Sequence, residues 1–89
     1  MGVRTWTITD RPYRFDYREA ERIIGELAGL EEYDEQAVLK IIRGIGRDLF
    51  EVLDEKPGYF GYDFGGKEWH WKLRRARNEA PGFFEAINA

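Results

Sequence analysis

The sequence predicts a small α+β fold. We expect a two-layer sandwich in the order β-α-α-β-β plus a short C-terminal turn, with a three-stranded antiparallel sheet covered on one face by two helices. Alternating β-prone residues over 4–9 predict a strand, and Gly65-Gly66 between two aromatic runs predicts a hairpin. Two stretches of apolar residues at helical spacing lie between them. Without a linker or internal repeat, the 89 residues predict one domain over 1–89.

The first strand alternates Thr with Trp6 and Ile8, which we place on the inner face, and Asp10-Arg11-Pro12 is expected to end it. Asp16 then has the character of a helix N-cap. The helix that follows has one apolar face, formed by Ala20, Ile23, Ile24, Leu27 and Leu30.

Asp34 can cap a second helix, which Pro57-Gly58 closes. Its apolar stripe consists of Val38, Ile41, Ile42, Ile45, Leu49, Val52 and Leu53. Because this stripe keeps its phase across Gly44 and Gly46, we expect one continuous helix.

The segment 39–53 also offers an alternative, since it contains the turn-like sequence Gly44-Ile45-Gly46. It resembles the helix-hairpin-helix DNA-binding motif, in which a Gly-hydrophobic-Gly turn offers backbone amides to a phosphate. The segment departs from that motif at Phe50, where the family has a small residue, and at Asp48, where it favours lysine. The resemblance implies a nucleic-acid contact at the turn 43–47.

The hairpin predicted around Gly65-Gly66 places Tyr62 opposite Trp69 and Phe60 opposite Trp71. Both tryptophans are therefore expected to be buried beneath the helices. The opposite, solvated face of the sheet would show Thr5, Thr7, Tyr59, His70, Lys72 and Arg74.

Acidic residues dominate the middle of the chain, because residues 16–56 contain twelve acids and six bases within a net charge of −3. An exposed acidic helical surface favours a protein partner that is basic or nucleic-acid-associated. The candidate partner-binding residues are Glu31, Glu32, Asp34, Glu35, Glu51 and Asp54.

The alternative function is nucleic-acid binding through the only basic cluster, on the predicted strand 72–77. Its candidate residues are Tyr59, His70, Lys72, Arg74, Arg75 and Arg77, together with Gly44 and Gly46 of the possible turn.

Composition argues against an enzyme, because the chain lacks cysteine and serine, the two commonest covalent nucleophiles, and has a single histidine. We expect no metal, no cofactor and no membrane span, and a cytoplasmic location. The leading hypothesis is a non-catalytic protein-binding module, of the kind represented by phage- or plasmid-encoded inhibitors such as anti-CRISPR or immunity proteins.

Overall fold

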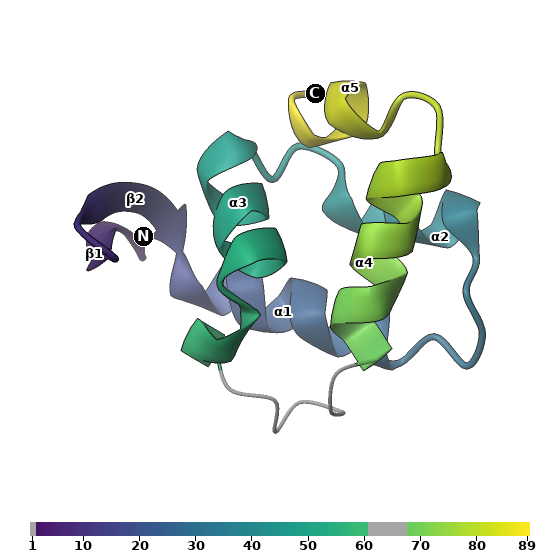
Figure 1. Cartoon of the computed structure of the whole chain (residues 1–89), viewed down its shortest axis with the longest axis horizontal. Helices are drawn as coiled ribbons and strands as arrows, with labels where there is room; N and C mark the ends of the chain where they lie inside the picture. Colours follow the sequence, from purple (N-terminus) through teal and green to yellow (C-terminus); the bar gives the residue numbers. More distant parts are fainter. Residues whose placement is uncertain (1, 61–67) are drawn as a thin grey trace.

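A computed structural model describes residues 2–60 and 68–89, which form an α+β fold with a two-stranded antiparallel sheet and several helices (Figure 1). The α+β class is as predicted, but the three strands and the order β-α-α-β-β are wrong. The elements are β1 (Val3–Ile8), β2 (Arg11–Asp16), α1 (Tyr17–Ala28), α2 (Glu35–Ile42), α3 (Arg47–Glu55), the 3-10 helix η1 (Pro57–Phe60), α4 (Glu68–Glu79) and α5 (Phe83–Ile87).

The sheet is an N-terminal hairpin of β1 and β2. The predicted first strand is confirmed, but Asp10-Arg11-Pro12 does not end the sheet. Thr9 and Asp10 form a two-residue turn, with φ of 54° and 65°, and the chain returns as β2. The alternation of buried Tyr13 and Phe15 with exposed Arg14 is the sequence signal for this second strand.

Helix α1 begins and packs as its sequence predicts. The carboxylate of Asp16 accepts a hydrogen bond from the N–H of Arg18 at 2.9 Å, so Asp16 is the N-cap. The apolar face is buried in the core at Ala20, Ile23, Ile24 and Leu27.

The continuous second helix is wrong, because the chain leaves the helical conformation between α2 and α3. Asp34 caps α2 as predicted, accepting from the N–H of Ala37 at 3.2 Å. Gly44 and Gly46 have φ of 74° and 83°, in the left-handed region that glycine enters without strain. Ile45 between them is still buried. One continuous helix and two helices joined by a turn therefore place the same apolar residues in the core.

Residues 68–79 form helix α4, so the predicted second hairpin strand is wrong there, and Gly65-Gly66 lies outside the described residues. Trp69, Leu73 and Ala76 recur at helical spacing and are buried. Lys, Arg and Ala also favour a helix. The expectation that both tryptophans are buried holds for Trp69 and fails for Trp71, which is 65% exposed.

Among the described elements, helix α4 packs against the most other helices, because it contacts α1, α2, α3 and α5. The hairpin packs through β2 on α3 and α1, and it lies to the left of the helices in Figure 1. The predicted C-terminal helical turn is confirmed as α5, which lies against α2. This arrangement brings α4 and the loop between α1 and α2 onto one part of the surface.

Candidate functional site

The predicted basic cluster on α4 is not a free cationic patch, because internal partners hold each of its four side chains. Lys72 is 9% exposed, and its ammonium donates to the carbonyl oxygens of Leu27 (3.0 Å) and Leu30 at the end of α1. Such a cation complements the partial negative charge of a helix C-terminus. Lys72 therefore joins α4 to α1.

Arg77 donates to the carboxylate of Asp54, a member of the predicted acidic surface, and the guanidinium of Arg74 lies 3.5 Å from the same carboxylate. The expectation that Asp54 is exposed is wrong, because its side chain is only 4% exposed. A buried carboxylate needs such charged partners to offset its lost hydration. One candidate of the acidic surface is thus the shared ion-pair partner of two candidates of the basic cluster.

Glu51 is also engaged within the fold, and its side chain is 22% exposed. Its carboxylate lies 3.3 Å from the guanidinium of Arg11 on the hairpin and 3.2 Å from that of Arg47 on α3. Asp48 accepts from Arg11 as well and from the backbone N–H of Arg14 at 2.9 Å. These carboxylates hold the hairpin against α3, so Glu51 is not a free acid of an exposed surface.

His70 and Tyr59 also make internal contacts. The Nε2 atom of His70 lies 2.7 Å from the carbonyl oxygen of Asp54 and must donate, because a carbonyl oxygen only accepts. Tyr59 is 38% exposed, but its ring packs edge-on against the ring of Trp6 at 6.3 Å. Neither residue adjoins a free cation of α4, so the fold does not bring the predicted stacking and backbone contacts together.

The acidic loop between α1 and α2 is exposed as predicted. Glu31, Glu32 and Asp34 are exposed, and Glu35 is half-exposed at the start of α2. None of them forms an ion pair within the described parts of the chain.

Tyr33 connects this loop to α4, because the guanidinium of Arg75 lies 4.2 Å from the centre of its ring. Arg75 also pairs with Glu79 at 3.3 Å. Burial raises the pKa of the Tyr33 hydroxyl above its ordinary value, and Glu35 raises it further, so the ring stays neutral.

Trp71 lies on α4 one turn before Arg75, a spacing that places the two side chains next to each other on the helix surface. It has the most exposed side chain among the large hydrophobic residues that the structure describes. We define the Trp71 surface as Trp71, Arg75, Tyr33, Glu31, Glu32 and Asp34. The sequence placed Trp71 in a strand and so missed it, although the helical spacing of Trp69, Leu73 and Ala76 already left position 71 off the buried face.

The turn between α2 and α3 has the conformation that the helix-hairpin-helix resemblance implies, but its amides are in use. The N–H groups of Gly44 and Gly46 donate to the carbonyl oxygens of Ala86 and Ile87 at 2.8 Å each. The N–H of Ile45 donates to Ile42 at 3.2 Å. In this conformation, no amide of the Gly-Ile-Gly turn is free for a phosphate.

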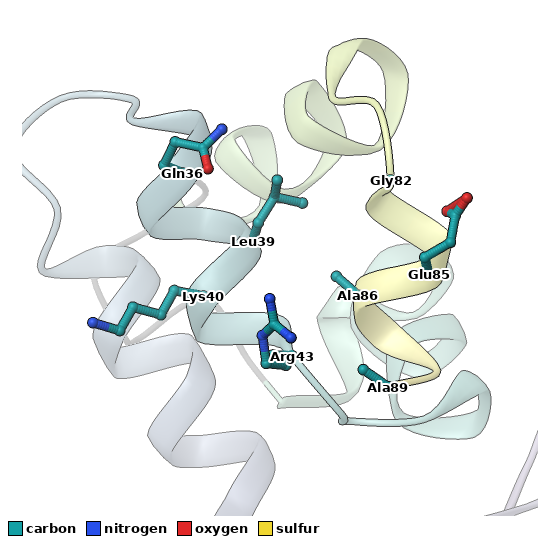
Figure 2. A pocket seen from close by; sticks show the side chains of 8 residues that line it. All are labelled: Gln36, Leu39, Lys40, Arg43, Gly82, Glu85, Ala86 and Ala89. Atoms are coloured by element: carbon teal, nitrogen blue, oxygen red, sulfur yellow. The ribbon is translucent and has the colours of Figure 1, made fainter.

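A groove of about 560 Å³ lies beside this turn, between α2 and α5 (Figure 2). Figure 2 shows the Arg43 side chain rising between the two helices, whereas Lys40 and Glu85 point away from each other at its sides. The groove is lined by Gln36, Leu39, Lys40, Arg43, Gly82, Glu85, Ala86 and Ala89. One guanidinium in a groove that also holds a carboxylate does not form a cluster of converging polar groups.

The described residues contain no group of three His, Cys, Asp or Glu side chains placed to hold a metal ion. None of the helices in the described ranges is long and apolar enough to cross a bilayer. Comparison with known protein families, with curated proteins and with solved structures gave no match to this chain. The Trp71 surface is therefore the strongest candidate site on chemical grounds.

Proposed function

We propose that this chain is a non-catalytic protein-binding module whose partner docks on the Trp71 surface. The observation that carries the proposal is the 65% exposure of Trp71 in a fold that buries Trp69 completely. Leaving this much apolar surface in water is unfavourable, and Trp is the side chain most enriched among residues that dominate binding energy at protein interfaces. Trp71 is the anchor that enters a pocket of the partner.

The neighbours of Trp71 support a protein interface. Arg75 is held between the Tyr33 ring and Glu79, so less side-chain freedom is lost when a partner binds. Tyr and Arg are, with Trp, the residues that alanine scanning most often finds to carry binding energy. Trp71, Arg75 and Tyr33 are thus three residues of the types that dominate interface centres, and they lie on α4 and on the loop between α1 and α2.

The acids of the loop specify the kind of partner. Glu31, Glu32 and Asp34 form no ion pair within the described structure, so they attract a basic surface and speed its approach. Nucleic-acid-processing proteins present such surfaces. We infer a partner with an apolar pocket rimmed by Lys or Arg, and inhibition by covering that basic surface.

A peptide-display selection against the immobilised full chain tests this function, because it finds binding sequences without a candidate partner in hand. We expect enriched peptides with Lys or Arg flanking a hydrophobic residue. Trp71→Ala should weaken binding of the selected peptide about 30-fold, the effect of losing an interface anchor. Phe84→Ala is the matched control, because Phe84 is also exposed (42%) but lies on α5.

Charge reversal tests the acidic loop separately. Glu31→Lys and Glu32→Lys together should slow association and flatten its salt dependence, whereas Glu85→Lys, at an exposed position on α5, should change neither as strongly. Asp34 is left unchanged because it caps α2. Gel shifts with short single- and double-stranded DNA and RNA complete the test. Micromolar nucleic-acid binding that is lost in Trp71→Ala would contradict a protein partner, as would selected peptides that bind Trp71→Ala unchanged.

A further inference from the structure

The outer edge of the hairpin has backbone groups that point away from the molecule. In an antiparallel ladder, hydrogen-bonded pairs alternate with pairs whose N–H and C=O groups point outward. Thr7 is paired with Pro12, which has no N–H, and Thr5 is paired with Arg14, whose N–H donates to Asp48 instead of β1. The alternation therefore assigns outward-pointing groups to Val3, Thr5 and Thr7.

Among the described residues, one edge of this two-stranded sheet, that of β2, has a hydrogen-bond partner in another element. Asp48 of α3 takes up the outward N–H of Arg14 on β2. The main contacts of the hairpin with α3 and α1 are made by β2, and β1 is the other strand of the sheet. Within residues 2–60 and 68–89, no backbone hydrogen bond joins Val3, Thr5 or Thr7 to a third element. An exposed edge of this kind is a template for another strand.

We propose that β1 pairs with β1 of a second copy of this chain, antiparallel and centred on Thr5, to form a continuous four-stranded sheet. In this register Thr5 lies opposite Thr5 of the second copy, Val3 opposite Thr7, and Arg4 opposite Trp6. The pairing is two-fold symmetric, as homodimer interfaces are. All three outward-facing residues exchange both of their backbone hydrogen bonds with the second copy.

The side chains of β1 are complementary to themselves in this register. Thr opposite Thr is a favourable cross-strand pair, and Arg4 meets the ring of Trp6, a cation–π pair that occurs twice by symmetry. Moving the centre to Arg4 would place two arginines directly opposite each other. Moving it to Trp6 would put Val3 opposite Thr9, which lies in the turn with φ of 54° and cannot continue the ladder.

Sedimentation velocity on the full chain, from about 10 µM to 1 mM, measures the proposed association, which is weak because the edge is short. We expect a species of twice the 10.5 kDa chain mass at the upper concentrations. Thr5→Lys should raise the dimer dissociation constant about tenfold, because only a register centred on Thr5 opposes the new charges. Gln36→Lys adds the same charge at an exposed position of α2 and should leave the constant unchanged.

Mixing two oppositely charged Thr5 variants should restore the dimer if the register is correct. Thr5→Lys and Thr5→Glu chains should each dimerise more weakly alone than the natural chain does and should form a tighter mixed dimer together, while far-ultraviolet circular dichroism shows that both remain folded. Thr5→Cys gives a second readout, because the natural chain has no cysteine and the opposed Cα atoms of such a pair are about 5.5 Å apart, within disulfide range. A monomeric natural chain at 1 mM, or a dimer that Thr5→Lys leaves unchanged, would overturn the proposal.

Discussion

At the scale of single residues, adjacent or similar side chains have opposite roles because of their positions in an element. Trp69 is fully buried and Trp71 is exposed, although a strand would have placed both on one face. Asp54 is a core ion-pair partner, whereas Glu55 next to it is exposed. The many acidic residues of this segment predicted an acidic surface. Only the packing of α3 against α4 shows that Asp54 pairs within the core while Glu55 stays exposed.

Asp54→Asn should lower the free energy of unfolding by about 2 kcal/mol. The variant keeps the side chain's shape but leaves the guanidinium groups of Arg74 and Arg77 without their carboxylate. Both arginines are partly exposed and regain some hydration, so the loss is smaller than for a fully buried pair. Urea unfolding measures it. The matched control Glu55→Gln should change stability by less than about 0.5 kcal/mol, and equal effects of the two substitutions would contradict this role.

At the scale of elements, helix caps and apolar spacing predicted α1 and the start of α2 because these signals are local. The same signals failed at residues 43–46, where the turn leaves Ile42, Ile45 and Leu49 buried just as a continuous helix would. They failed at β2 because Thr9 and Asp10, not glycine, form its turn. The alternating aromatic pattern at Trp69 and Trp71 concealed the helical spacing of α4.

Replacing Gly44 and Gly25 by alanine, one at a time, distinguishes a glycine in a turn from a glycine in a helix. Gly44→Ala should destabilise the fold by about 1–2 kcal/mol, because a φ of 74° is strained for any residue with a Cβ. Gly25→Ala should stabilise it by up to about 1 kcal/mol, because Gly25 is an exposed position of α1 and no atom lies within 4 Å of the added Cβ. Thermal and urea unfolding measure both. A neutral Gly44→Ala variant would mean that the α2–α3 turn relaxes into a helix.

At the scale of the whole molecule, charges and polar groups from distant segments neutralise one another. The acidic middle and the basic C-terminal segment meet at Asp54, Arg74 and Arg77, so a net charge summed along the sequence overstates both patches. What the sequence could not provide is which charges pair, because that depends on the long-range packing of α4. The exposed loop acids and Trp71 lie outside this pairing, and they form the surface that we propose for a partner.

Carbonyl oxygens of helix α5 accept hydrogen bonds from the α2–α3 turn, and a substitution at Phe83 tests how much the packing of α5 stabilises the fold. Phe83 is 2% exposed and its ring packs edge-on against Phe50 at 5.3 Å, so Phe83→Ala should lower the free energy of unfolding by about 3–4 kcal/mol. Phe84→Ala, at the neighbouring exposed position, should lower it by about 1 kcal/mol or less.

Hydrogen exchange then shows whether α5 and the turn act together. The amides of Gly44 and Gly46 should be protected in the natural chain, because they donate to α5 carbonyl oxygens, and Phe83→Ala should speed their exchange about a hundredfold. If α5 detaches without global unfolding, amides at the centre of α1 keep their protection in the same variant. Rapid exchange at Gly44 and Gly46 in the natural chain would show instead that these amides are available to a ligand, and would restore the turn as a phosphate-binding candidate.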